Sequence, residues 1–470
     1  MNQVWPAPSP RELSLRSLEL VRRKVETARA EAAIAPNEIV LVSLEAPVVS
    51  VEGFLQRFPE LDAVSWHPAD GSVVAGLGVA HSITGGGAGR FRSVLEQGGQ
   101  LWKRMRAPGS ARGALDAPRL LGGFAFADEG AAQAPWTEFG PARFVLPRVT
   151  YVGNAERATL TLAIERAELE RGVEGPGALL LRRAHEALLD DPRPLPSRAA
   201  EPLEHYEPDA EAFERRVEEL TRLIAAREFE KVVTAREVQL SSRQALDAIS
   251  TLVALREQAA GCERFLFRWG DSAFIGATPE RLLSKRGLTL ETEALAGSID
   301  SKTESPEFHL RGSSKELEEH RLVVAAIERA LEPVCGHVQA QSAPTVRHLK
   351  HIMHLCTPIR ARLDRDTHVL DIVERLHPTP AVGGVPTAAA TAWISRHEGF
   401  DRGWYSGAVG WFDAAGDGDF NVALRSGLLH SKRAWLYAGA GIVNGSVARA
   451  EFAETTLKLS AVRTSLRTRL

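Results

Sequence analysis

The strongest constraint on the fold of this chain is its series of short, β-branched apolar segments, each bounded by turn residues. Runs of roughly four to eight such residues indicate strands, and two runs around Asp70-Gly71 predict an antiparallel hairpin. The strands expected from this pattern are 39–42, 63–66, 73–78, 122–126, 143–147 and 149–164. Amphipathic helices are expected over 11–32 and 209–227. Strands and helices do not alternate regularly, so the pattern favours α+β with large sheets over a βαβ array.

Composition excludes several classes of protein. The 470 residues are 44% hydrophobic and 25% charged, enough apolar material to bury a sizeable core. The net charge of −3 gives no electrostatic footprint for nucleic acid or an anionic membrane. No run of about 18 apolar residues occurs, which argues against a spanning helix. The first residues lack the basic and apolar regions of a signal peptide.

The three cysteines, Cys262, Cys335 and Cys356, are far apart in the sequence. Their number is odd and no CxxC motif occurs, which argues against a disulfide scaffold. Free thiols are typical of a reducing compartment, so we expect a cytoplasmic protein.

The proline-rich stretch 191–196 is the clearest break in the chain. Such a segment is typical of an exposed connection. Composition alone leaves two interpretations open, a domain boundary or a long surface loop within one domain.

Lys231 lies in the segment Glu230-Lys231-Val232-Val233-Thr234-Ala235-Arg236, whose valines favour a strand. Only nine of the 57 basic residues are lysines, so each deserves notice. Burying an ammonium is costly, and an edge lysine that keeps its charge in water is one interpretation. The other is a partly desolvated lysine with a lowered pKa, which can act as a general base.

Two acidic positions have both a structural and a catalytic interpretation. Glu280 follows the apolar run 275–279 at a turn, where it is either a carboxylate at a helix start or an acid in a site. Glu319 lies in 315–320, at the start of an expected helix, where acidic residues are common.

The C-terminal region places Glu451, Glu454 and Lys458 on one helix face, because their spacing is i, i+3 and i+7. Ser446 is the expected N-cap of that helix. The three side chains form either an exposed ion-paired face or a cation site, since carboxylate oxygens suit Mg²⁺.

Two familiar motif types fail on spacing. Gly439, Gly441 and Gly445 do not form GxGxxG, and the glycines at 85–89 lack the Lys-Ser/Thr of a P-loop, which argues against a nucleotide site. His348, His351 and His354 lack a fourth ligand placed for tetrahedral zinc. A single histidine facing a substrate is favoured instead.

Together these motifs resemble the chorismate-utilising enzymes, which include isochorismate, salicylate, anthranilate and aminodeoxychorismate synthases. The resemblance covers 206–465 through KVVTAR, FIGATPERLL, SSKELEEH, HIMHLCTPI, RGWYSGAVGWF and AGAGIVNGS, while the first 200 residues match weakly. The chain is most similar to the isochorismate synthases, and among them to the menaquinone-pathway type. LHPTPAVGG at 376–384 is typical of the isochorismate synthases, and ALAGS at 294–298 lacks the lysine nucleophile of aminodeoxychorismate synthases. The long N-terminal half resembles the menaquinone-pathway enzymes more than the compact siderophore ones.

The resemblance implies conversion of chorismate to isochorismate, in which water adds at C2 and the 4-hydroxyl leaves. It implies Lys231 as the base and Glu280 as the acid, so their pKa values must be shifted in opposite directions. It implies Mg²⁺ as cofactor, held by Glu319 and Glu454 with Glu451 nearby. Tyr405 and Arg425 are expected on a hairpin of 404–412 and 420–429. The implied substrate-binding residues are Gly297, Ser298, His354, Tyr405, Arg425, Gly439, Gly441 and Lys458.

The implied fold is a single α+β domain over 1–470, a sandwich of two antiparallel sheets flanked by helices with the site in the cleft between them. Residues 1–200 form its divergent N-terminal half, and 206–465 form the chorismate-binding region. The expected partner is chorismate alone, without nucleic acid, membrane or an obligatory amidotransferase, and the protein is expected to be a monomer.

The product is expected to enter menaquinone or siderophore biosynthesis. Three alternatives stay open: a salicylate synthase, an amine-using anthranilate or aminodeoxychorismate synthase, and a non-catalytic chorismate-binding homologue.

Overall fold

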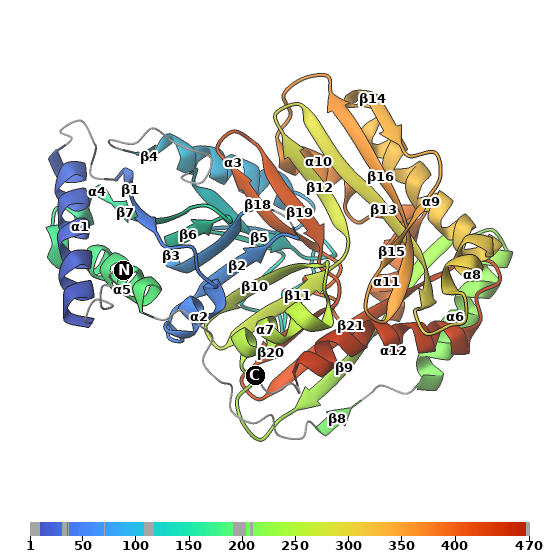
Figure 1. Ribbon diagram of the computed structural model, residues 1–470. Helices are drawn as coiled ribbons and strands as arrows, with labels where there is room; N and C mark the ends of the chain where they lie inside the picture. The colour runs from blue at the N-terminus through green and yellow to red at the C-terminus, as the bar shows by residue number, and fades with distance from the viewer. Residues whose placement is uncertain are drawn as a thin grey trace, which may run out of the picture.

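The computed structural model describes residues 10–30, 35, 37–69, 71–107, 117–190, 204–206 and 210–466 (Figure 1). The proline-rich stretch 191–196 and Asp70 of the expected turn lie outside the described residues.

Helices lie around the strands within the described ranges (Figure 1). They are α1 (Pro10–Ala30), α2 (Val51–Gln56), α3 (Arg90–Lys103), α4 (Arg166–Leu169), α5 (Pro176–Leu189), α6 (Ala210–Ala225), α7 (Ala248–Gln258), α8 (Pro306–Gly312), α9 (Ser314–Leu331), α10 (Val369–Leu376), α11 (Thr387–His397) and α12 (Ala448–Ser465). The expected helices at 11–32 and 209–227 correspond to α1 and α6. None of the helices in the described ranges is long and apolar enough to cross a membrane.

The strands pair almost entirely in antiparallel fashion. They are β1 (Ile39–Ala46), β2 (Ala63–His67), β3 (Val73–Gly85), β4 (Met105–Arg106), β5 (Arg119–Phe124), β6 (Ala142–Gly153), β7 (Ala158–Glu165), β8 (Glu204–Tyr206), β9 (Lys231–Ser241), β10 (Glu263–Trp269), β11 (Ser272–Thr278), β12 (Arg281–Arg286), β13 (Thr289–Asp300), β14 (Cys335–Ala340), β15 (Thr345–His348), β16 (Ile352–Leu363), β17 (Gly384–Val385), β18 (Ala408–Asp413), β19 (Gly418–Val422), β20 (Ser426–His430) and β21 (Arg433–Ile442). The exception is the short parallel pair β1–β4.

Strand β6 joins two antiparallel layers. One edge of β6 pairs with β3, and the first layer continues as β3–β2–β10–β11–β20–β21–β9. The other edge pairs with β5 near its start and with β7 near its end. From β5 the second layer continues as β5–β18–β19–β12–β13–β16. The expected α+β fold with antiparallel layers is confirmed, with the addition that β6 makes the two layers continuous.

Helices cover the layers where the site residues are found. Figure 1 shows α12, in red, along β21, and α9, in orange, beside β13 and β16. Each helix buries an apolar face against its layer, for example Val323 and Ile327 of α9. Their polar N-terminal turns are thereby held near the space between the layers.

The chain crosses between the layers at two neighbouring places. Residues 279–280 connect β11 of the first layer to β12 of the second, and residues 423–425 connect β19 of the second to β20 of the first. The crossings are hydrogen-bonded, because Val422 N donates to Glu280 O (3.1 Å) and Ala277 N donates to Arg425 O (3.2 Å).

Two strand predictions were wrong in their extent. The expected hairpin of 404–412 and 420–429 is shorter, since only β18 and β19 pair and the chain then leaves the layer at Arg425, whose φ is 49°. Residues 149–164 are not one strand. They contain the end of β6, a turn and β7, because Asn154 Oδ1 accepts bonds from Glu156 N and Arg157 N.

An aromatic cluster in the first layer anchors the segment before β18. The Trp404 ring lies 5.3 Å from those of Phe139 and Trp269, and its Nε1 donates to Gly140 O at 2.9 Å. This packing fixes the neighbouring Tyr405 at the space between the layers.

Candidate active site

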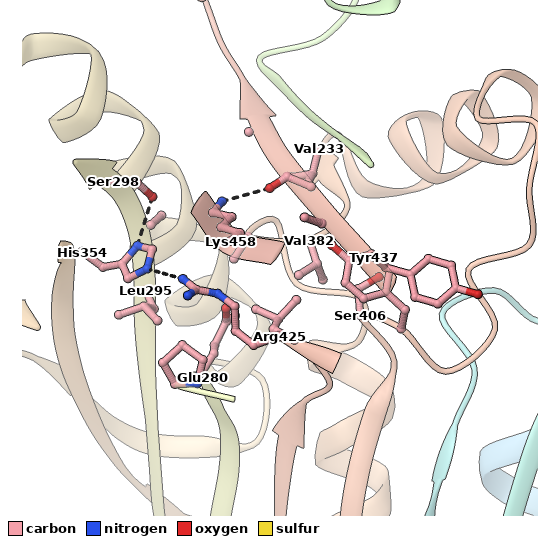
Figure 2. A pocket seen from close by; sticks show the side chains of 18 of the residues that line it. Val233, Glu280, Leu295, Ser298, His354, Val382, Ser406, Arg425, Tyr437 and Lys458 are labelled. Atoms are coloured by element: carbon pink, nitrogen blue, oxygen red, sulfur yellow. Dashed lines mark hydrogen bonds between the residues drawn. The ribbon is translucent and has the colours of Figure 1, made fainter. Parts of the chain in front are cut away.

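A pocket opens between the layers beside the two crossings (Figure 2). Its cavity volume is about 60 Å³. The residues expected from sequence that line it are Glu280, Gly297, Ser298, Glu319, His354, Tyr405, Arg425, Gly439, Gly441 and Lys458. The other expected residues, Lys231, Glu451 and Glu454, do not line the pocket. Lys231 contacts Glu319 and Glu454 contacts Lys458, which both line it, whereas Glu451 pairs with Lys315, which does not.

Lys231 begins β9 and is fully buried, contrary to the edge interpretation. Its Nζ lies 2.8 Å from Glu319 Oε1 but makes no well-directed hydrogen bond within the described part of the chain. Gly441 leaves room for this pair, since a Cβ there would lie 2.1 Å from Glu319 Oε1 and 2.9 Å from Lys231 Cε. Gly441 was expected among the substrate-binding residues, and the structure shows that it makes room for these two side chains.

Glu280 lies in a crossing segment, not at a helix start, and its side chain is buried. Burial, and then the nearby Glu293 carboxylate, raise its pKa to about 8, and Lys231, Lys458 and Arg347 only partly oppose this. The carboxyl group is therefore mostly protonated at neutral pH and can donate a proton to a leaving group.

Arg425, His354 and Ser298 form a hydrogen-bonded chain on one wall (Figure 2). Arg425 Nη2 lies 3.0 Å from His354 Nε2, and His354 Nδ1 lies 3.0 Å from Ser298 Oγ. Burial and the Arg425 charge hold the pKa of His354 well below its usual range. A neutral ring that accepts from arginine at Nε2 must carry its proton on Nδ1. The guanidinium is thus held in a buried position that suits a carboxylate.

The opposite wall carries Tyr405 and Gly439. The Tyr405 ring stacks on Tyr437 with centroids 5.2 Å apart, and burial raises the pKa of its hydroxyl. Tyr405 is thus a neutral donor or acceptor. Lys458 Nζ donates to Gly439 O at 2.9 Å, which ties α12 to β21.

Gly297 adopts φ 78°, at a bulge in the β13–β16 pairing. Its carbonyl lies 3.3 Å from His354 Nδ1, and the next amide, Ser298 N, donates to Glu316 Oε2 at 2.7 Å. The left-handed backbone is accessible to glycine at no steric cost, and it turns Ser298 toward the pocket.

A carboxylate cluster lies between the N-terminal turns of α9 and α12. Lys458 Nζ is 2.6 Å from Glu454 Oε1, and Lys315 Nζ is 2.7 Å from Glu451 Oε1. Burial and the Glu454 charge raise the pKa of Glu451 to about 7. Burial opposes ionisation of Glu454, but Lys458, Lys315 and Ser298 together outweigh it and lower the pKa of Glu454.

The donor set of this cluster fits Mg²⁺ in its chemistry. Glu316 also belongs to the carboxylate cluster, and burial and the Glu319 charge raise the pKa of its carboxyl group. Carboxylates that repel one another attract a cation, and magnesium usually takes only one or two of them together with water and substrate oxygens. Within the described ranges, no three acidic, histidine or cysteine side chains are already grouped to enclose a metal.

Ser446 is not the N-cap of α12, which was a wrong prediction. Val447 occupies that position, and Ser446 Oγ accepts instead from Val443 N at 3.2 Å. The histidine trio is divided by a turn between β15 and β16, so that His348 Nε2 lies 2.9 Å from Glu307 Oε1 at the surface while His354 faces the pocket.

Sequence reasoning missed several groups at the site. Arg402 lines the pocket and donates to Val233 O and Val382 O. Glu316 and Lys315 belong to the carboxylate cluster. Arg402 is in the RGWYSG motif and the other two are in SSKELEEH, so position in the motifs was the only signal.

The family model of the chorismate binding enzymes matches residues 25–467. This chain belongs to the chorismate-binding enzymes. It is 38% identical over 419 residues to the salicylate biosynthesis isochorismate synthase of Pseudomonas aeruginosa, covering 87% of this chain and 83% of that protein. It is 30% identical over 392 residues to isochorismate synthase MenF of Bacillus subtilis, covering 80% and 81%.

Among solved structures, the chain is similar to MenF, the menaquinone-specific isochorismate synthase from Escherichia coli, with a TM-score of 0.78 and 26% identity. That alignment covers 97% of this chain and 100% of that one. The resemblance to isochorismate synthases that the motifs indicate is therefore confirmed.

Proposed function

We propose that this enzyme converts chorismate to isochorismate, and that Lys231 and Glu280 carry out the reaction. The observation that carries the proposal is a buried acid with a pKa of about 8 in the same pocket region as a buried lysine. The matched family and the names of its members support the choice of substrate.

In the proposed reaction, Lys231 takes a proton from water, whose oxygen forms a bond to C2 of the ring. The double bonds shift and the bond from C4 to its hydroxyl breaks. Glu280 gives its proton to the departing hydroxyl, which leaves as water. The ring loses and gains one hydroxyl, so the net change is an isomerisation. General acid and base groups of this kind contribute about 10²–10⁴-fold each.

The pocket walls bind and orient the substrate in this proposal. Arg425 pairs with the enolpyruvyl carboxylate through its fork, assisted by the Tyr405 hydroxyl. The Arg425 charge lies in a buried site, where an ion pair is strong but must be well oriented. His354 and Ser298 supply that orientation.

Mg²⁺ is the proposed cofactor, with Glu319 and Glu454 as ligands and Glu451 nearby. When bound, it would neutralise the ring carboxylate of the substrate and act as a Lewis acid. The ion pairs of these carboxylates with Lys231, Lys458 and Lys315 are the charges that a cation would replace or rearrange.

The test is product analysis. The purified full chain is incubated with chorismate and Mg²⁺, with and without ammonium, and the products are identified by chromatography and mass spectrometry. We expect isochorismate as the accumulating product, unchanged by ammonium and abolished by EDTA. Glu280→Gln is the matched inactive variant.

Other products would contradict the proposal in distinct ways. Salicylate with pyruvate would indicate a salicylate synthase, and an aminated product would indicate an amine-using synthase. Chorismate binding without turnover would indicate a non-catalytic homologue. We also propose that the product is used in menaquinone or siderophore biosynthesis. The names of the relatives include both salicylate biosynthesis and a menaquinone-specific enzyme.

A further inference from the structure

A second ion pair lies directly behind Glu280. Arg347, on β15, binds Glu293, on β13, through both arms of its fork, with Nη1 to Oε1 at 2.5 Å and Nη2 to Oε2 at 2.7 Å. Bidentate pairs of this kind have a defined orientation as well as strength. Neither residue lines the pocket, so neither is placed to touch the substrate.

The pair holds the backbone on both sides of Glu280. Arg347 Nη1 donates to Pro279 O at 2.6 Å, and Arg281 N donates to Glu293 Oε1 at 3.1 Å. Pro279 and Arg281 are the residues immediately before and after Glu280. The segment 279–280 runs between two layers and lies outside both strands, so these side-chain bonds substitute for ladder bonds there.

We propose that Glu293 and Arg347 are positioning residues, which aim the Glu280 carboxyl into the pocket by fixing the peptide groups on either side of it. The inference deepens the proposed function and rests on Glu280 as the acid. It assigns two further residues to the reaction and gives each a separate effect.

The charges of the pair also act on Glu280. The charged and titratable groups that face it are Glu293, Lys231, Lys458, Arg347, Tyr405 and Cys356. After burial, Glu293 is the largest influence, and it raises the pKa of Glu280, whereas Arg347 lowers it. Removing the Glu293 charge therefore lowers the pKa of Glu280, and keeping a cation at 347 leaves it nearly unchanged.

The test compares pH profiles of kcat and KM for chorismate in the full chain and in four variants: Glu280→Gln, Glu293→Gln, Arg347→Lys and Glu263→Gln. Glu263 is the matched control, because it is a largely buried carboxylate bonded to the Arg281 side chain that does not face Glu280. Thermal unfolding of each variant shows that it folds.

In Glu293→Gln, we expect the decrease of kcat at alkaline pH to begin at a lower pH than in the wild type. In this variant, kcat at pH 8 should be more than about threefold lower than kcat at pH 6. KM should change less than about twofold. Arg347→Lys retains the positive charge but loses the bidentate contact with Glu293. We therefore expect kcat to fall about tenfold, while the decrease of kcat at alkaline pH stays at the same pH as in the wild type. Glu263→Gln should reproduce the wild-type profile.

A second readout does not depend on turnover. The carbonyl stretch of the protonated Glu280 carboxyl, identified by its loss in Glu280→Gln, is followed by infrared spectroscopy against pH. We expect a midpoint near 8 in the wild type and a lower one in Glu293→Gln.

The outcomes separate the two claims. A wild type that forms no isochorismate, but whose Glu280 midpoint falls in Glu293→Gln, overturns the proposed function and supports the pair's influence on Glu280. Isochorismate formation with a Glu293→Gln profile and midpoint equal to the wild type overturns the further inference. Wild-type turnover by Glu280→Gln overturns the acid assignment and the inference together.

Discussion

Lys231 Nζ lies 2.8 Å from Glu319 Oε1, so the proposed base is paired with a proposed metal ligand. The two side chains are buried and pack against Gly441. In the proposed mechanism, Lys231 must move away from Glu319 to accept a proton from water. A cation bound by Glu319 would favour this movement, because it would compete with Lys231 for the same carboxylate. The proposal therefore couples binding of the metal to release of the base.

Lys231→Met is expected to lower kcat by at least about a hundredfold, because it removes the proposed base that activates the water. The matched control is Lys285→Met, since Lys285 is equally buried but does not line the pocket. Its Nζ lies 2.8 Å from Asp417 Oδ1. The control should lower Tm and change kcat less than about twofold. Steady-state kinetics and thermal unfolding of both variants decide the matter, and equal loss of kcat in the two would count against a base at 231.

The buried acid predicts a pH dependence of stability that is independent of turnover. The pKa of Glu280 is raised from 4.5 to about 8 in the folded chain, so between these values the folded state binds more protons than the unfolded state. Its contribution to stability therefore falls as pH rises through this window. Glu280→Gln lacks this loss, and its free energy of unfolding relative to wild type should be higher at pH 9 than at pH 6.

Urea unfolding of both proteins at the two pH values measures this difference. Other titrating groups, such as Glu451, cancel because both proteins carry them. An equal difference at pH 6 and pH 9 would show that Glu280 has an ordinary pKa.

Sequence reasoning identified residues that line the pocket but not the contacts between their side chains. Lys231 is notable in the sequence because a lysine in an apolar strand is unusual, whereas the role of Glu280 was implied only by the resemblance of the motifs to the family. The pairing of Ser298 with His354 depends on the register of β13 with β16, which no local pattern specifies.

The layer crossing at Arg425 could not be predicted either. Its left-handed φ of 49° is uncommon outside glycine, and packing between layers imposes it. Arg347 and Glu293 are 54 residues apart, and each alone resembles an ordinary charged strand residue. Tertiary structure alone brings them to the two sides of Glu280.

The proposed magnesium site predicts separate effects for two variants of α9. Glu319→Gln removes an oxygen anion from the proposed ligand set and should weaken Mg²⁺ binding by about tenfold or more. Glu318→Gln, the neighbouring exposed residue paired with Arg321, should leave it unchanged. Calorimetric titration of Mg²⁺ in the presence of chorismate measures both, because the substrate supplies part of the coordination. Equal affinities in the two variants would argue against Glu319 as a ligand.

Gly441→Ala tests whether the close contact at β21 is required for the site. A Cβ would lie 2.1 Å from Glu319 Oε1 and 2.9 Å from Lys231 Cε, so both side chains must move. We expect kcat to fall by more than about tenfold, because a displacement of about 1 Å in a catalytic group is costly.

The matched control is Gly99→Ala in α3, where a Cβ meets nothing within 4 Å. Alanine in a helix interior is favoured over glycine by about 0.5–1 kcal/mol, so this variant should unfold at a higher temperature with unchanged kcat. Kinetics and thermal unfolding of the two alanine variants separate a steric effect at the site from a general effect of losing a glycine. If Gly441→Ala retained full activity, the Lys231–Glu319 contact would not be needed in the geometry described, and the coupling between metal and base would have to be abandoned.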